Sequence, residues 1–230
     1  MDGPGIGTAD LATFRRLAAA RATRRDLADT LLLIPCSAGK RGTRQLDVPP
    51  LTMTEFLGPA ARELLAEGPA AAFARARLDG SSPTLAALAR YSGQPYATPG
   101  VVDRLLEAMS RGLHVVIVSG GYGLVRAEEP IQDYEAPMTK TLTIWRRRIP
   151  VILREYVERN GIRRTFGAFS TVYSAAVPDR LTAEDWRAVP TLDDVGGGPA
   201  MVRIPQRVAS VTRELLEKDL GASVGWTRTS

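Results

Sequence analysis

Short apolar runs predict the strands of this protein, and the longer polar segments between them have helical lengths. The runs Leu31–Pro35 and Val115–Val118 are almost wholly apolar, which is typical of strands buried on both faces of a sheet. Arg164–Ser170 is predicted as a third strand and Thr191–Val195 as a fourth. Because helices separate the strands, we expect an α/β fold: a small, mainly parallel sheet with helices on both faces and more helix than strand.

Apolar residues spaced three and four positions apart predict the helices. The longest covers 142–159 and contains Pro150, which should kink or split it. Gly68-Pro69 is expected to break another apolar stretch into two helices. The other predicted segments are 8–29, 53–67, 68–78, 82–91, a helix that ends over Leu105–Gly112, a short helix from Thr182 to Trp186, and a last helix over 203–219.

The chain has 230 residues and no internal repeat, which favours one domain with a large core. We expect a basic helical extension over 1–30, a single α/β domain over 31–221 and a tail over 222–230. One face of the extension is rich in arginine, and this face is either solvated or in contact with nucleic acid. The candidates for such contact are Arg15, Arg16, Arg24 and Arg25.

Composition excludes several classes of protein. Hydrophobic residues make up 44% of the chain and charged residues 24%, which excludes disordered, collagen-like and coiled-coil chains. No apolar run approaches the roughly 18 residues of a membrane helix, and no signal pattern opens the chain, so we expect a cytoplasmic protein without a membrane partner. With one cysteine, Cys36, and one histidine, His114, neither a disulfide nor a metal site is expected, and no cofactor is predicted.

Lysine is rare in this chain, although the formal net charge is +5. That charge permits a nucleic-acid or phosphate partner without establishing one. The three lysines are Lys40, Lys140 and Lys218, and the first lies in a glycine-containing loop directly after a predicted strand. Lys40 is therefore a candidate for a mobile cation or an amine nucleophile, with an ordinary surface lysine as the alternative.

Three predicted strands end in glycine-containing loops, at 36–42, 119–123 and 196–198. Ligands of open parallel sheets bind beyond the carboxyl ends of the strands, so we expect one pocket with the Lys40 loop and the Tyr122 turn facing each other across it. Glycines let backbone amides approach a ligand, and serines add hydroxyl donors; the alternative is that these glycines only make tight turns. The candidate ligand-binding residues here are Cys36, Ser37, Gly39, Ser119, Gly120, Gly121, Tyr122 and Gly197.

The segment 124–138 is too polar and too rich in proline to be a helix, and a connection of this length is often functional. We select Arg126 and Tyr134 in it as ligand-binding candidates. Glu129 and Asp133 join Lys40 as catalytic candidates, because a carboxylate near a buried lysine tunes its pKa or acts as a general base. The alternative is a surface loop with solvated acids.

Four segments carry a family resemblance in chain order. They are Leu33–Lys40 (LIPCSAGK), Tyr91–Tyr96 (YSGQPY), Val118–Arg126 (VSGGYGLVR), and the run Ile131–Met138 followed by Leu142 and Trp145. Together these segments resemble the YaaA family of peroxide-stress proteins over about residues 31–150. The resemblance implies a YaaA-like fold, DNA binding and protection against oxidative damage. Cys36 stands where that family has proline or serine, and Glu135 where it has arginine.

A shorter likeness points to nucleobase chemistry. Pro35-Cys36-x3-Lys40 is similar to the Pro-Cys-x3-Lys core of archaeosine synthases, in which the lysine adds to a modified guanine. Arg41 and Gly42 stand where that motif continues with proline and tyrosine. The turn that begins at Ser119 also looks loosely like nucleotide-binding turns of lysine-decarboxylase-like proteins. These likenesses imply a site that handles a nucleobase or nucleotide.

Two functional hypotheses follow, with an interaction scaffold as a third. The first is a YaaA-like stress protein that binds nucleic acid or a nucleobase. The second is an enzyme acting on a nucleobase, nucleoside or nucleotide, at a glycosidic bond or an amidine-forming carbon. In the enzyme, Lys40 would be the nucleophile or anion binder and Asp133 or Glu129 the acid or base. Serine hydroxyls and the Gly120-Gly121 amides would hold a phosphate or an oxyanion, and Tyr122 or Tyr134 would stack on the base.

Overall fold

The computed structural model describes residues 26–40, 45–188, 200–218 and 227–228. Its main sheet has six strands in the order β10-β9-β8-β1-β4-β5. The four central strands run parallel, and both edge strands are antiparallel to their neighbours. The strands are β1 (Thr30–Pro35), β4 (His114–Ser119), β5 (Gly123–Arg126), β8 (Arg164–Ala168), β9 (Glu184–Ala188) and β10 (Thr227–Arg228). The predicted α/β fold with a mainly parallel sheet is confirmed.

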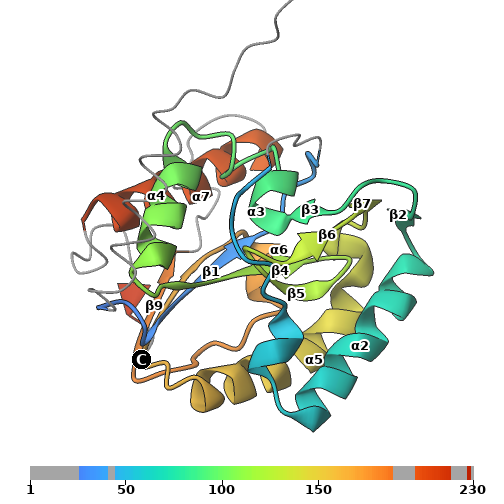
Figure 1. Ribbon diagram of the computed structural model, residues 1–230, viewed down its shortest axis with the longest axis horizontal. Coiled ribbons are helices and arrows are strands. Elements are labelled where there is room, and N and C mark those ends of the chain that lie inside the picture. The colour runs from blue at the N-terminus through green and yellow to red at the C-terminus, as the bar shows by residue number, and fades with distance from the viewer. Residues whose placement is uncertain (1–25, 41–44, 189–199, 219–226, 229–230) are drawn as a thin grey trace, which may run out of the picture.

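Helices cover both faces of this sheet (Figure 1). They are η1 (Met53–Phe56), α2 (Pro59–Phe73), α3 (Ala87–Arg90), α4 (Val101–Ser110), α5 (Met138–Arg159), α6 (Thr171–Ser174) and α7 (Ala200–Glu217). Alternate residues of β1 enter two different cores because successive side chains of a strand point to opposite faces. Leu32 and Ile34 pack with α4 and α7, whereas Leu31 and Leu33 pack with α2 and α5.

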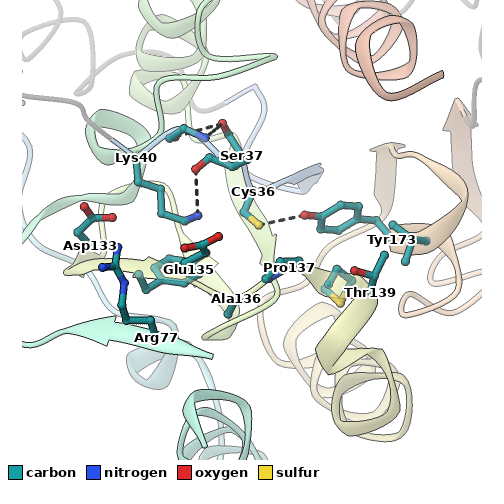
Figure 2. A pocket seen from close by; sticks show the side chains of 15 residues that line it. Cys36, Ser37, Lys40, Arg77, Asp133, Glu135, Ala136, Pro137, Thr139 and Tyr173 are labelled. Atoms are coloured by element: carbon teal, nitrogen blue, oxygen red, sulfur yellow. Dashed lines mark hydrogen bonds between the residues drawn. The ribbon is translucent and has the colours of Figure 1, made fainter. Parts of the chain in front are cut away.

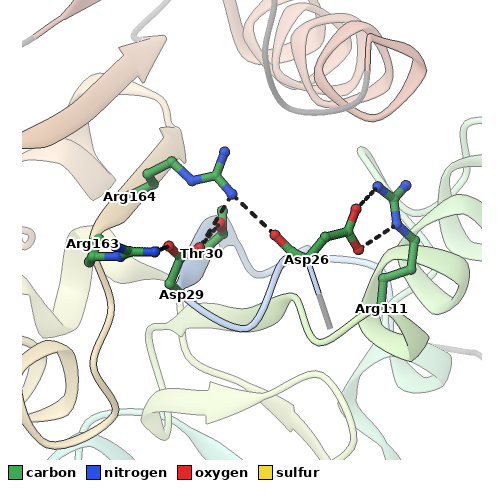
Figure 3. A network of polar contacts seen from close by, with 6 residues as sticks. All are labelled: Asp26, Asp29, Thr30, Arg111, Arg163 and Arg164. Atoms are coloured by element: carbon green, nitrogen blue, oxygen red, sulfur yellow. Dashed lines mark hydrogen bonds and ion pairs between the residues drawn. The ribbon is translucent and has the colours of Figure 1, made fainter. Parts of the chain in front are cut away.

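Ion pairs connect neighbouring segments at the end of the sheet where the parallel strands begin (Figure 3). The turn before β1 carries Asp26 and Asp29. Asp26 pairs with Arg111, which follows α4, at 2.6 Å. Asp29 pairs with Arg163 at 2.6 Å and with Arg164 at 3.3 Å, at the start of β8. The amino-terminal ends of the strands are thereby tied together, and the carboxyl ends are the edge that holds the cavity described below.

The segment 124–138 forms strands, although its polarity predicts a loop. After β5 it continues as β6 (Pro130–Ile131) and β7 (Asp133–Glu135). These pair with the distant strands β3 (Leu85–Ala86) and β2 (Arg77–Asp79), respectively. The predicted loop is wrong because partners about 50 residues away satisfy its backbone, and such partners leave no local signal in the sequence.

The predicted break at Gly68-Pro69 is wrong, and of the two outcomes predicted for Pro150, a kink or a split, the split is excluded. Helix α2 continues through Pro69 and α5 through Pro150. Gly68 does not break α2; it leaves room for the ring of Trp145 on α5, which a side chain at that position would overlap. Both helices therefore continue past their prolines because they pack on each other, which outweighs the hydrogen bond that each proline removes.

Two short helices are replaced by other elements. The segment 82–91 is the strand β3 followed by one turn of α3. The predicted helix from Thr182 to Trp186 is instead the start of β9, because the buried Asp185 accepts hydrogen bonds from Thr165 Oγ (2.7 Å) on β8 and from Leu181 N (2.8 Å). The predicted strand 191–195 and the first part of the predicted helix 8–29 lie outside the described residues.

No helix in the described ranges has the length and apolarity needed to span a bilayer.

Candidate functional site

A cavity of about 560 Å³ lies at the carboxyl ends of β1 and β8, as predicted for a parallel sheet. In the sheet, β1 lies between β4 on one side and β8 on the other. The loops that follow these strands therefore lead away from each other at this point. Three segments line the cavity: residues 36–40 after β1, residues 133–139 with Arg77 of β2, and Val172 and Tyr173 of α6 (Figure 2).

Hydrogen bonds of Ser37 hold the loop after β1 against the turn over 91–96. Ser37 Oγ accepts from the backbone N–H groups of Gly39 (3.1 Å) and Gly93 (2.9 Å) and donates to the Gly39 carbonyl (3.1 Å). A side chain at Gly39 would come within 2.9 Å of Ser92 Oγ. The glycine is therefore required for this close approach. Ser37 and Gly39 both line the cavity, as predicted, and Ser37 also shapes the loop.

Lys40 is buried, with only 6% of its surface exposed, and it lines the cavity. Its Nζ lies 4.3 Å from the centre of the Tyr134 ring and 3.4 Å from the Ala38 carbonyl oxygen. Burial lowers the pKa of Lys40, and the neighbouring Cys36, Asp133 and Glu135 oppose that shift. The buried amine therefore gives up its proton more readily than an exposed lysine does.

The carboxylates of Asp133 and Glu135 project from alternate positions of β7 on the Lys40 side of the cavity (Figure 2). Asp133 is half-buried and Glu135 is exposed. Within the described part of the chain, neither side chain forms a hydrogen bond or an ion pair. Both are therefore free to accept hydrogen bonds from a ligand.

Cys36 and Tyr173 form the opposite wall. Their Sγ and hydroxyl oxygen are 3.1 Å apart, and Cys36 is 8% exposed. Tyr173 is half-buried and presents an aromatic ring beside the thiol. The wall is thus largely apolar, which suits a flat ligand more than a fully hydrated one.

The turn after β4 lies beneath this cavity and does not line it. Ser119 Oγ is 2.7 Å from the Tyr134 hydroxyl and accepts from the N–H groups of Gly121 (3.2 Å) and Tyr122 (3.0 Å). Those amides are therefore used within the turn. A side chain at Gly120 would overlap the Ala136 carbonyl, so this glycine allows the turn to pack against the cavity wall.

The prediction that the Lys40 loop and the Tyr122 turn line one shared cavity is consequently wrong. Both segments contact Tyr134, whose ring lies under Lys40 and whose hydroxyl binds Ser119. Tyr122 packs edge-to-face against Phe73 and Tyr134. Ser119, Gly120, Gly121 and Tyr122 support the floor of the cavity through Tyr134 and do not line it.

Arg126 and Glu129, two further predicted site residues, do not line the cavity. Arg126 pairs with Glu128 at 2.9 Å and donates to the Tyr156 hydroxyl at 2.5 Å. The carboxylate of Glu129 accepts from the N–H groups of Met53 (2.8 Å) and Arg126 (3.1 Å). Glu129 thus holds the start of η1 and does not line the cavity.

Sequence reasoning missed Glu135, Tyr173 and Arg77 as cavity residues. Glu135 could have been found, because it shares a strand face with Asp133 two residues earlier. Tyr173 and Arg77 come from other elements and have no local signal. The predicted candidates Arg15, Arg16, Arg24, Arg25 and Gly197 lie outside the described residues.

No protein-family model matches this chain, and its comparison with curated proteins finds no match. Among the described residues, no group of three or more histidine, cysteine, aspartate or glutamate side chains is placed to hold a metal ion. The chemistry of the cavity therefore has to be argued from its own side chains.

Proposed function

We propose that the cavity binds a nucleobase, either free or as part of a nucleoside, nucleotide or nucleic acid. The observation that carries this proposal is the grouping of a buried Lys40 with two unpaired carboxylates around one cavity of about 560 Å³. This volume lies within the range of about 300–1,000 Å³ of small-molecule sites. The edge of a base carries donors and acceptors side by side, which an ammonium group and carboxylates can pair.

The charges of the described lining favour a base over a phosphate. Lys40 and Arg77 are balanced by Asp133 and Glu135, so the cavity presents both signs and no excess of positive charge. A phosphate site would be expected to concentrate cations. The half-buried ring of Tyr173 and the apolar wall beside it are suited to stacking on a flat heterocycle.

The resemblance to the YaaA family supports a biological setting for this binding. We infer that the protein acts on nucleic acid or its components during oxidative stress. That inference rests on the motifs of residues 31–150. All four of those motifs form or support the cavity: the loop after β1, the turn over 91–96, the turn within 118–126 and the segment 131–138.

A second candidate is an enzyme that modifies a nucleobase or nucleoside. It is favoured by the lowered pKa of Lys40, since a neutral amine is the form that attacks an electrophilic carbon. Asp133 lines the same cavity as Lys40, together with Glu135, and would accept a proton in the role for which Glu129 was also a candidate. Product formation measured by mass spectrometry should then stop in a Lys40→Met variant that remains folded.

Calorimetric titration with nucleobases, nucleosides, nucleotides and short oligonucleotides tests the proposal. We expect the wild-type protein to bind at least one of these classes, and Lys40→Met to bind it at least about tenfold more weakly, which is a loss of about 1.4 kcal/mol. Lys218→Met is the matched control, because Lys218 is exposed near the end of α7. The proposal fails if no class binds, or if both variants bind as the wild type does.

A further inference from the structure

Helix α5 is strongly basic. It contains six cationic and two acidic residues, a net charge of +4, in a chain whose formal net charge is +5. By contrast, α2 and α4 each contain one cationic and two acidic residues. Among the helices of the described residues, α5 therefore has the largest net positive charge.

Five of the cations of α5 are exposed and have no partner in the described residues, and one of the five, Arg159, is the last residue of the helix. The other four form a set that we name the α5 stripe: Lys140, Arg146, Arg147 and Arg154. Lys140, Arg147 and Arg154 are spaced seven residues apart and so lie nearly above one another along the helix. The opposite side of α5 is buried in the core, and Arg148, between the two sides, pairs with Glu67 at 3.3 Å.

The α5 stripe begins at the mouth of the cavity. Thr139, in the first turn of α5, lines the cavity and directly precedes Lys140 (Figure 2). From Lys140 to Arg154 the helix rises about 21 Å, at 1.5 Å per residue. A linear anion held along this line would therefore reach the cavity with one end.

We propose that the α5 stripe binds the sugar–phosphate backbone of a single-stranded nucleic acid, one of whose bases enters the cavity. This inference rests on the proposed function and adds the polymeric form of the ligand. Arginine pairs with phosphate through two parallel hydrogen bonds, and three of the four cations of the stripe are arginines. A base can enter a cavity only when it is unpaired, which favours a single strand over a duplex.

An anionic membrane fits the same helix less well. A helix that lies on a membrane exposes an apolar face beside its basic one. The apolar side of α5 is buried against the sheet and α2, and Val151, at 51% exposed, is its one large exposed hydrophobic residue. The partner to which the observations point is therefore nucleic acid.

The test compares two double variants of the full chain by fluorescence anisotropy with a labelled oligothymidylate and a labelled mixed-sequence single strand. Arg147→Gln/Arg154→Gln removes two charges from the α5 stripe. Arg207→Gln/Arg213→Gln removes two from α7, on the other face of the sheet. We expect the stripe variant to bind the strands about tenfold more weakly at low salt, and its slope of log affinity against log salt to fall by about 1.4, at 0.7 for each lost phosphate contact. The α7 variant should retain the wild-type slope.

Titration of the free nucleoside separates the two proposals. If the wild type and the stripe variant bind the nucleoside equally well while the variant loses strand affinity, both proposals stand. If the nucleoside binds but the two double variants bind the strands alike, the stripe is overturned and the proposed function survives. If the wild type binds neither nucleoside nor strand, the proposed function fails. The proposal for the α5 stripe would also be overturned if the stripe were needed for binding to phosphatidylserine vesicles and the protein did not bind the oligonucleotides.

Discussion

Two groups of ionisable side chains lie at opposite ends of the parallel strands, and they are organised in opposite ways. The cavity group at the carboxyl ends is Lys40, Asp133 and Glu135. The buried cluster near the amino end of β4 is His114, Arg126, Glu128, Glu129 and Tyr156. In the buried cluster every residue has at least one hydrogen-bond partner, whereas the cavity carboxylates have none among the described residues.

This difference indicates that the charges of the buried cluster stabilise the fold, whereas those of the cavity group are available to a ligand. Arg126 and Glu128 are each almost completely buried, and together they neutralise each other at 2.9 Å. Lys40 is equally buried but forms no ion pair with the carboxylates on its side of the cavity, so its desolvation is only partly offset. Removing a residue from the buried cluster should therefore cost stability, and removing one from the cavity group should cost ligand affinity.

The largest expected effect is the loss of Arg126. In Arg126→Met, Glu128 becomes an unpaired buried carboxylate, and we expect the free energy of unfolding to fall by about 3–5 kcal/mol in urea denaturation. Arg126→Lys, which retains the charge, should lose less. At temperatures where the variant is folded, its affinity for the nucleobase ligand should equal that of the wild type. A loss of affinity without a loss of stability would contradict the separation of the two groups.

The pH dependence of stability gives the next effect. Burial, together with the nearby Arg126, lowers the pKa of His114 from 6.5 to about 4. The folded state therefore binds this proton less readily than the unfolded state, and stability is lost as the pH falls from above 6.5 to below 4. At 1.36 kcal/mol per pKa unit the loss is about 3 kcal/mol.

His114→Gln supplies the control for that measurement, since glutamine keeps a polar group near the Tyr156 hydroxyl, which lies 2.7 Å from His114 Nδ1. Urea denaturation of both proteins between pH 4 and pH 8 should show the wild type losing more stability than the variant on acidification. Parallel curves for the two proteins would show that His114 does not titrate in this way.

The same two groups show how far the sequence could be interpreted. The α/β fold and the position of the Lys40 loop could be predicted because buried strands and their carboxyl ends leave local signals. Glu129 and Asp133 could not be told apart, since they are only four residues apart and both acidic. The chain turns from β6 to β7 between them, and the distant strands β2 and β3 determine which carboxylate reaches the cavity.

The basic surface illustrates the same limit. Sequence reasoning selected the arginines of residues 8–29, which lie outside the described residues. The equally basic segment 142–159 is predicted only as a helix, without a binding role. What distinguishes α5 is that its arginines face solvent and that its first turn borders the cavity, and both are properties of tertiary packing.

A smaller effect is expected for Tyr134, which connects the cavity to its support. Tyr134→Phe removes the hydroxyl that lies 2.7 Å from both Ser119 Oγ and the Tyr91 hydroxyl, but it keeps the ring under Lys40. We expect a loss of about 1–2 kcal/mol in the free energy of unfolding. Ligand affinity should change by less than about threefold, because the ring and Lys40 remain. Tyr122→Phe, whose hydroxyl has only a long contact of 3.4 Å with Gln132 N, should be nearly neutral.

The smallest expected effect is that of Lys40 on stability, and it should differ in sign from that of Arg126. Because the pKa of Lys40 is lowered in the folded state, its protonation opposes folding, and stability is lost as the pH falls from above 10.5 through the lower folded pKa. At neutral pH, Lys40→Met should therefore be as stable as the wild type or more stable by up to about 1 kcal/mol. As the pH approaches 10, the wild type should gain stability relative to Lys40→Met. If Lys40→Met were markedly less stable than the wild type at pH 7, Lys40 would stabilise the fold, as the residues of the buried cluster do. Its loss of ligand binding would then follow from the loss of stability and would not require a contact in the cavity.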